Sequence, residues 1–325
     1  HPPEIEGVVG IYPRTKKNCI AILINWIKNG GNTTFYLNGF YSKFGSLVPL
    51  LLIKIFSIFY HVPEVVLAPR GGVSSGALAF RSFRKIIFLK ALHFLGILKN
   101  VRFHVVSEDE KNDLCNVLGE NYREQCLTVA NIVNSNTAIT DQGLKSKNTP
   151  VHLVFLARIH PIKNLNFLFD VVNNVHEEIE LHIYGTIDDQ DYFDKCVERF
   201  QYVDSHVHVK FCGEVLQSNV VSVLSNYDLY LLPTLGENFG HTIYESLSAS
   251  TPVLVSDKTP WRGGDFQSLW EFSLDNPHLW SNKINEYCNI DHNKFIKLRK
   301  NARKSAAKWV NQQEYSQLYE KLFKI

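Results

Sequence analysis

The segment from residue 151 to residue 256 contains a series of short apolar runs of strand character, with helical segments between several of them. This alternation limits the possible folds more than any other feature of the sequence. The expected strands span residues 151–157, 181–184, 207–211, 229–232 and 253–256. Strands that alternate with helices indicate a doubly wound parallel sheet, whose ligands bind in loops at the carboxyl ends of the strands. The pattern therefore predicts an α/β domain with a binding site formed by loops.

The first part of the chain shows the same alternation less regularly. The expected strands there span residues 8–12, 33–37, 65–68 and 102–106. A helical pattern covers residues 80–98, and Ser107 and Glu110 have the spacing of a capping box, which predicts the start of another helix. A second α/β unit with a parallel sheet is therefore expected.

A polar stretch rich in Asn, Ser and Thr runs from residue 131 to residue 149 and divides the chain. The total of 325 residues suits two domains, because one domain commonly holds roughly 100–200 residues. We expect a Rossmann-like N-terminal domain over residues 1–149 and a C-terminal domain over residues 150–325 that ends in a basic helical tail. The sequence contains no Met and does not begin with one, so we expect part of the N-terminal domain to be missing from it.

The composition argues against several classes of protein. The hydrophobic share of 45% and the charged share of 20% are those of an ordinary soluble protein. The longest apolar run, residues 47–60, is shorter than the roughly 20 residues that span a bilayer. Residues 1–4 are neither basic nor apolar, so no secretory signal is expected. The six cysteines form no C-x-x-C motif and predict reduced thiols in a cytoplasmic protein without a structural metal.

Charge is unevenly distributed along the chain. Between Glu6 and Glu108 the sequence has one acid, Glu64, against thirteen Lys or Arg residues. Within the helical pattern of residues 80–98, basic residues such as Arg81, Arg84 and Lys85 alternate with large apolar residues. This segment is either a solvated helix face or a peripheral contact with an anionic membrane. Neither interpretation implies a nucleic-acid partner, and we expect none.

The segment from residue 232 to residue 257 carries the strongest functional signal. It has the pattern strand, loop, helix, strand, with Glu237 in the loop and Glu245 in the helix. Phe239 and Gly240 precede the helix, whose first N–H groups suit phosphate or sugar oxygens. Two carboxylates at this spacing could accept hydrogen bonds from two sugar rings. The alternative is a capping acid followed by a glutamate that faces solvent.

Two cations follow the first strand of the same domain. Arg158 and Lys163 lie in the loop after residues 151–157, where they could stabilise the negative charge of a departing diphosphate without a metal. Gly185 and Gly213 follow the next two strands, and glycine there permits a close approach of the backbone to a ligand. Taken singly, these residues would be surface cations and ordinary turns. Residues 188–191 contain a D-x-D pattern, formed by Asp189 and Asp191, which we interpret as the start of a helix.

Together these motifs resemble the family 4 retaining glycosyltransferases, which have the GT-B fold. The signature of that family matches at Glu237, Phe239, Gly240, Glu245, Pro252 and Val253, and its R-x-x-x-x-K loop matches at Arg158 and Lys163. The sequence departs at Ser248 and Ser250, where the family has Ala and Gly. The resemblance implies two Rossmann-like domains that face each other across a cleft.

The resemblance also implies roles for the residues and a biological setting. Glu237 would contact the donor sugar and Glu245 the ribose hydroxyls of a UDP- or GDP-sugar, with Arg158 and Lys163 on the diphosphate. The donor-binding residues would include Asn238, Phe239, Gly240, Gly185 and Gly213. The expected reaction transfers a hexose to a glycan or lipid-linked acceptor in bacterial surface-polysaccharide synthesis, at the cytoplasmic face of the membrane. No metal or other cofactor is implied.

The first half resembles one branch of the same family more weakly, over residues 67–77 and 103–110. This chain has Arg70 and Gly71 where many members have a His-Gly pair, so the residue that acts on the acceptor is open. The glycine-rich loop that opens the family's N-terminal domain is not recognisable. His104 alternates with apolar residues of an expected strand and is interpreted as a core histidine rather than a base. His241 lies at the start of the signature helix, where it is either a donor contact or an ordinary helix residue. A GT-B epimerase and an inactive nucleotide-sugar-binding protein remain as alternatives.

Overall fold

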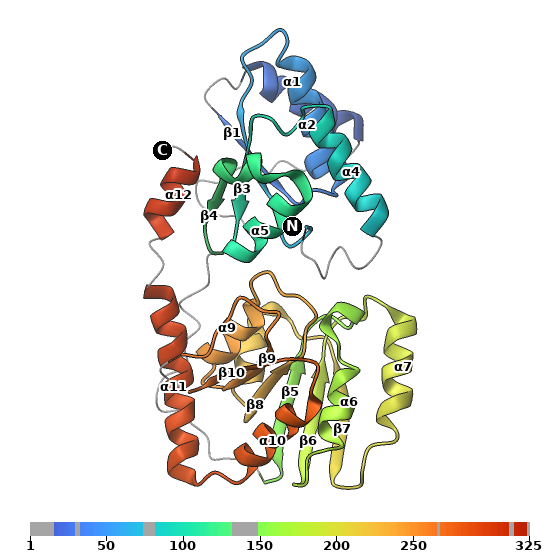
Figure 1. The fold of residues 1–325 in the computed structure, drawn as a ribbon, viewed down its shortest axis with the longest axis vertical. Helices are drawn as coiled ribbons and strands as arrows, with labels where there is room; N and C mark the ends of the chain where they lie inside the picture. The colour runs from blue at the N-terminus through green and yellow to red at the C-terminus, as the bar shows by residue number, and fades with distance from the viewer. Residues whose placement is uncertain are drawn as a thin grey trace.

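The computed structural model describes residues 16–29, 33–73, 82–131, 149–264, 267–311 and 315–323. Its strands form two separate parallel sheets, one of four strands and one of six. Figure 1 shows the two sheets in two lobes, with helices packed around each. The predicted strand at residues 8–12 lies outside the described residues.

The first sheet has the strand order β1-β2-β3-β4, and its neighbouring strands are parallel. Its strands are β1 (Thr34–Asn38), β2 (Glu64–Ala68), β3 (Val101–Val105) and β4 (Cys126–Thr128). The helical segments of this part are α1 (Lys16–Asn29), η1 (Lys43–Leu47), α2 (Val48–Phe56), α4 (Ser82–Phe94), α5 (Glu108–Leu118) and η2 (Glu120–Gln125). Parallel neighbours need long crossover connections, which these helices supply. The strands predicted at 33–37, 65–68 and 102–106 are confirmed to within a residue.

The second sheet has the order β10-β9-β8-β5-β6-β7, which reverses between β5 and β8. Its strands are β5 (Val151–Leu156), β6 (Ile179–Tyr184), β7 (Val207–Gly213), β8 (Leu229–Leu232), β9 (Val253–Ser256) and β10 (Leu269–Phe272). Its helical segments are η5 (Pro161–Lys163), α6 (Phe167–Val172), α7 (Gln190–Phe200), η6 (Gln217–Asn219), α8 (Val220–Leu224), α9 (His241–Ser248), α10 (Pro277–Cys288) and α11 (His292–Asn311). All five predicted strands are present, and the doubly wound sheet is confirmed.

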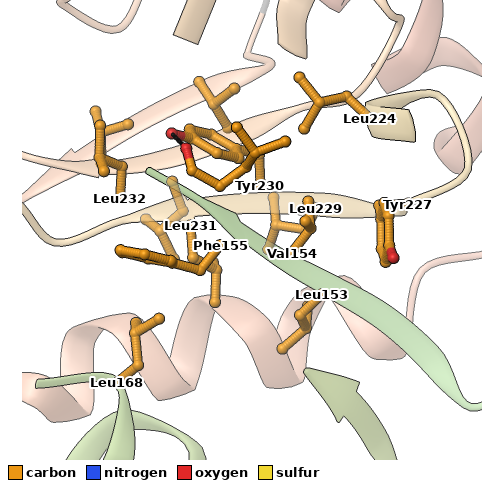
Figure 2. Close-up of a cluster of buried hydrophobic side chains, with 14 of the residues drawn as sticks. Leu153, Val154, Phe155, Leu168, Leu224, Tyr227, Leu229, Tyr230, Leu231 and Leu232 are labelled. Atoms are coloured by element: carbon orange, nitrogen blue, oxygen red, sulfur yellow. Dashed lines mark hydrogen bonds between the residues drawn. The ribbon is translucent and has the colours of Figure 1, made fainter. Parts of the chain in front are cut away.

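The core of the second sheet is built on its two central strands. Leu153, Phe155 and Leu231 are fully buried, as is every residue of β8. Figure 2 shows Leu168 of α6 and Leu224 of α8 on opposite sides of these strands, so apolar side chains cover both faces. A strand buried on both faces reads as a continuous apolar run, which is why β5 and β8 were recognisable in the sequence.

The last helix, α12 (Tyr315–Phe323), corrects the predicted domain assignment of the C-terminal tail. The sequence placed the whole tail with the second domain. The structure instead packs α12 against the first sheet (Figure 1), where the Tyr319 ring lies 5.6 Å from the His104 ring and the Phe323 ring 5.7 Å from the Tyr36 ring. Leu322 is fully buried there. The chain therefore crosses between the two sheets twice, once near residue 150 and once after α11.

Within the part of the chain that the structure describes, no helix combines the length and the apolar character needed to cross a bilayer.

Candidate active site between the two sheets

The candidate site lies at the point where the strand order of the second sheet reverses. Strands β5 and β8 are neighbours there, although β6 and β7 separate them in sequence. Ligands of doubly wound sheets usually bind at the carboxyl ends of the strands that flank such a reversal. Arg158 and Lys163 follow β5, while Glu237, Asn238 and Phe239 follow β8. The topology thus brings together two motifs that lie about eighty residues apart in sequence.

The loop after β8 is fixed by an aromatic cluster. The Phe239 side chain is buried, with ring centroids 6.1 Å from Trp261 and 5.1 Å from Trp309. The Trp261 indole N–H donates to the Phe239 carbonyl over 2.5 Å. Phe239 was predicted to help bind the donor. Its side chain is buried in this cluster and positions the loop, and the residue also lines the cavity described below.

Gly240 ends this loop and caps α9. Its φ is +80°, in the left-handed region that glycine adopts without strain. A Cβ on Gly240 would lie 2.7 Å from Cδ1 of Ile243 and 3.2 Å from Cγ of Glu237. Glycine is therefore required for the sharp turn that leads Glu237 into the site and exposes the first N–H groups of α9.

Glu237 and Lys163 form an ion pair between the two loops. The Lys163 ammonium donates to Oε2 of Glu237 over 2.5 Å, and the side chains of Lys163 and Glu237 are only 13% and 16% exposed. The Leu235 N–H also donates to the Ile162 carbonyl over 2.7 Å, which ties the loops along their backbones. An ion pair removed from water to this extent is stronger than a surface pair, so it holds the Glu237 carboxylate in one place.

Arg158 lies at the outer edge of the site. Its guanidinium donates to Oδ2 of Asp188 over 2.6 Å, and its side chain remains 62% exposed. The neighbouring Asp189 accepts from the Tyr192 N–H and caps α7, which confirms the helix start predicted for the D-x-D segment. Asp188 is the partner of Arg158. Among the described residues, no three His, Cys, Asp or Glu side chains cluster as metal ligands would.

Glu245 projects from α9 toward the segment after β7. Its Oε1 accepts from the Gln217 amide of η6 over 2.5 Å. Burial raises the pKa of this carboxyl, and the hydrogen bond from Gln217 opposes that shift. Glu237 and Glu245 therefore face different partners, Lys163 and Gln217, as two carboxylates that bind different parts of one ligand would.

Gly185 and Gly213, both predicted to bind the donor, differ in the surroundings that a side chain would meet. Gly185 has φ +154°, and a Cβ there would lie 1.8 Å from the Ala157 carbonyl oxygen, so this glycine is needed for packing against the end of β5. Gly213 has φ +78°, and no atom lies within 4 Å of the position of its Cβ. Close approach to a ligand was predicted for both, and at Gly185 the Ala157 backbone gives a further reason for glycine. Gly185 thereby positions the chain that leads into Arg158.

A cavity of about 590 Å³ separates the loop after β8 from the first sheet. The first sheet contributes Asn38 after β1, Arg70 after β2 and Asn131 after β4. The opposite wall is formed by Glu237, Asn238, Phe239, Gly240 and His241, and Tyr319 of α12 also lines the cavity. The carboxyl ends of strands from both sheets thus face one space.

Two contacts connect the walls of this cavity. The Asn131 amide nitrogen lies 3.4 Å from Nε2 of His241. The buried carboxylate of Glu110 accepts from the Gly71 and Val106 N–H groups over 2.7 and 2.8 Å, and it also meets the Asn238 side chain. Burial raises the pKa of Glu110, and these three hydrogen bonds oppose the shift.

Sequence reasoning missed several residues that line this cavity or lie next to its walls. Glu110 was interpreted only as part of a capping box, and Ser107 does cap α5 by accepting from the Glu110 N–H. Asn38, Asn131 and Tyr319 were not singled out. The position of Asn38 at the end of a predicted strand could have indicated it. Tyr319 could not be found this way, because it reaches the site only through the return of α12.

Comparison with known proteins agrees with this arrangement. The family model of glycosyl transferases group 1 matches residues 136–309, which is more than half of the chain. The chain belongs to this family. Its α/β fold with two parallel sheets is that of the GT-B glycosyltransferases, as the sequence predicted.

Two characterised relatives match parts of the chain. The phosphatidyl-myo-inositol mannosyltransferase of Mycobacterium leprae is 30% identical over 115 residues, which cover 34% of this chain and 29% of that protein. The GtfA subunit of the UDP-N-acetylglucosamine–peptide N-acetylglucosaminyltransferase of Streptococcus pneumoniae is 25% identical over 161 residues, 48% of this chain and 30% of that protein. Each match spans less than a third of the relative.

Solved structures resemble nearly the whole chain. Anabaena Alr3699/HepE in complex with UDP and glucose superposes with a TM-score of 0.72 at 15% identity, over 94% of this chain and 81% of that one. Sucrose-phosphate synthase from Thermosynechococcus elongatus gives a TM-score of 0.71 at 16% identity, over 96% of this chain and 80% of that one. At these identities the likeness is one of fold.

Proposed function

We propose that this protein is a retaining glycosyltransferase that moves a hexose from a UDP- or GDP-sugar to a glycan or lipid-linked acceptor. One observation carries the proposal. Glu237 pairs with Lys163 between the loops that follow β8 and β5, Arg158 belongs to the same β5 loop, and the loop of Glu237 faces the first sheet across the 590 Å³ cavity. The second sheet with its helices would bind the donor, and the first sheet with its helices and α12 would bind the acceptor.

The donor would lie along the carboxyl ends of β5, β8 and β7. Glu245 is half-buried and faces the segment after β7, which suits a carboxylate that accepts from the two ribose hydroxyls. Glu237 lines the cavity and suits the hydroxyls of the donor sugar. The open space at Gly213 leaves room for the nucleoside. A GT-B protein of the same architecture was crystallised with UDP and glucose, which supports a donor of this type.

The reaction would need positive charge where the diphosphate leaves. The bond between the anomeric carbon and the diphosphate oxygen breaks, and negative charge builds on the departing phosphate. The acceptor hydroxyl oxygen bonds to the anomeric carbon on the face that the diphosphate leaves, which retains configuration, and the hydroxyl proton passes to the leaving phosphate. Lys163 has three N–H donors, so its pair with Glu237 leaves two for phosphate oxygens. Arg158 would add a second cation in place of a metal.

We place this activity in the synthesis of bacterial surface polysaccharide, at the cytoplasmic face of the membrane. The relatives named above act on a phosphatidyl-inositol and on a peptide, so the family reaches both lipid and polymeric acceptors. The six cysteines are all free thiols, which suits a reducing compartment.

We further propose that the face of the first domain formed by α2, the turn after it and α4 contacts anionic membrane. Phe59 and Phe94 are 78% and 88% exposed, and Phe83 and Ile87 continue the exposed stripe along α4. Lys54 of α2 lies beside Gly96, in the turn after α4, so the two apolar regions adjoin. Exposed apolar side chains among cations favour a membrane contact over a simply solvated helix face. Phe80 and Arg81 lie outside the described residues.

A transfer assay tests the main proposal. The full chain is incubated with α-linked UDP- and GDP-hexoses, with and without glycan and lipid-linked acceptors, and the products are examined by NMR. We expect acceptor-dependent release of nucleoside diphosphate and an α-linked product. Sugar released or epimerised without acceptor would indicate the epimerase, and a bound but unconsumed donor the inactive binding protein. A β-linked product would contradict retention.

A further inference from the structure

Arg70 occupies an unusual backbone position at the end of β2. Its φ is +53°, a left-handed conformation that residues with long side chains rarely adopt. The turn is closed by a hydrogen bond from the Gly72 N–H to the Pro69 carbonyl, and the Glu110 carboxylate holds the Gly71 N–H. This construction fixes the point from which the Arg70 side chain enters the cavity.

Three uncharged groups orient the Arg70 guanidinium. Its Nε donates to the Asn38 side-chain oxygen over 2.9 Å, one Nη donates to the Asn131 side-chain oxygen, and the other to the Tyr36 hydroxyl over 3.0 Å. Tyr36 is itself fixed, because its hydroxyl lies 2.6 Å from Nδ1 of His104. A guanidinium has five N–H donors, so two remain for a ligand.

Among the described residues, Arg70 has no acidic partner in an ion pair. The acid across the cavity, Glu237, is already paired with Lys163. Glu110 is close enough to interact electrostatically with Arg70, but both of its oxygens accept from backbone N–H groups. His241 cannot balance this charge, because an imidazole is either neutral or cationic. Burial lowers its pKa, Glu237 opposes the shift and Arg70 adds to it. Arg70 is exposed and presents its charge to the space that the substrates would share.

We infer that Arg70 binds an acidic group, a carboxylate or phosphate, on the acceptor, and so selects an anionic acceptor. The inference rests on the proposed function and deepens it. The acceptor is favoured over the donor diphosphate because Arg70 stands on the first sheet, while Arg158 and Lys163 supply cations on the sheet that would bind the donor. A planar guanidinium matches a carboxylate or phosphate with two parallel hydrogen bonds.

Titration of the UDP-saturated full chain with inorganic phosphate tests this, because UDP occupies the donor phosphate positions. Binding is followed by calorimetry in the wild type, Arg70→Gln and Arg123→Gln. Arg123 is the matched control, an arginine of the first domain that is already paired with an acid, Glu120. We expect Arg70→Gln to weaken phosphate binding by roughly 10- to 100-fold, the range for loss of a charged hydrogen bond, and Arg123→Gln to leave it unchanged. Arg70→Lys keeps the positive charge but loses the two parallel N–H donors of the guanidinium, so its phosphate affinity should lie between those of the wild type and Arg70→Gln.

UDP affinity, measured alone, separates this inference from the proposed function and also reports whether each variant folds. Unchanged UDP binding with lost phosphate binding supports an anion site for the acceptor. Equal phosphate binding in wild type and Arg70→Gln overturns the inference while leaving the transferase proposal intact. Weakened UDP binding in Arg70→Gln, with an unchanged unfolding transition, would assign Arg70 to the donor and overturn the acceptor role. Failure of the wild type to bind any nucleotide would instead count against the proposed function.

Discussion

The two sheets both direct cations toward the candidate site, but they hold these cations differently. On the second sheet, Lys163 and Arg158 are each paired with a carboxylate, Glu237 and Asp188. On the first sheet, Arg70 is held by two amides and a phenol. A carboxylate partner fixes a cation and neutralises part of its charge, whereas uncharged partners fix a cation and leave its charge for a ligand. In the proposed roles, the paired cations would bind a diphosphate that carries several charges, and Arg70 would bind a single acidic group.

The largest expected effect concerns the paired cations of the second sheet. Lys163→Ala and Arg158→Ala should each lower turnover by roughly two to three orders of magnitude, as removal of an oxyanion donor does, because both would stabilise charge that develops in the transition state. Lys163 is the less exposed of the two and should show the larger loss.

The measurement is the steady-state rate in EDTA, with Lys195→Ala as control because Lys195 is an exposed cation on α7 of the same domain. The proposed role of the paired cations would be contradicted if turnover required added Mg²⁺ or Mn²⁺. It would also be contradicted if Lys163→Ala and Arg158→Ala were as fast as the wild type.

A smaller effect is expected from the glycine that positions Arg158. Gly185→Ala should destabilise the fold by at least about 1–3 kcal/mol, since its Cβ would meet the Ala157 carbonyl and its φ is one that only glycine adopts freely. Gly213→Ala is the matched control, because its φ is also positive but nothing lies near its Cβ. Urea unfolding of both variants measures the difference. Equal losses in the two would show that backbone conformation alone, and not the contact with β5, sets the cost.

The smallest expected effect is on membrane binding, which we propose for the surface of the first domain and not for that of the second. On the first domain the exposed Ile58, Phe59 and Phe94 adjoin basic residues, and each cation near an anionic bilayer contributes about 1 kcal/mol. Co-sedimentation with vesicles that contain anionic lipid should fall several-fold for Phe59→Ser or Phe94→Ser, and it should fall for the wild type at high salt. Tyr202→Ser is the control, an equally exposed aromatic residue of the second domain. Binding that ignores lipid charge, or an equal loss in Tyr202→Ser, would refute the proposed membrane surface.

The sequence predicted the second domain better than the first, and the reason is physical. Strands such as β5 and β8 are buried on both faces and read as continuous apolar runs. The missed strands, β4 and β10, lie at the sheet edges and have only three and four residues. Because these short edge strands bury few residues, they produce no clear run of apolar residues in the sequence.

The site divides in the same way. Glu237, Lys163 and Arg158 could be predicted because they follow recognisable strands, and parallel strands bring their carboxyl ends together. The burial of the Phe239 side chain could not be predicted, because it depends on contacts with Trp261 and with Trp309 of α11, which are distant in sequence. Tyr319 reaches the cavity only because α12 packs on the first sheet, and no local sequence pattern predicts this return of the chain.

The central claim is that the second domain binds a nucleotide sugar through Glu245 and Glu237 in separate roles. The most direct measurement is equilibrium unfolding of the full chain with UDP, GDP and their hexoses in EDTA, in the wild type, Glu245→Ala and Glu237→Ala. A true nucleotide at about 100 times its Kd should stabilise the wild type and Glu237→Ala by about 2.7 kcal/mol. Glu245→Ala should lose most of this stabilisation, because the ribose would lose its carboxylate partner. Absence of stabilisation by every nucleotide, or the same stabilisation in Glu245→Ala as in the wild type, would contradict the account.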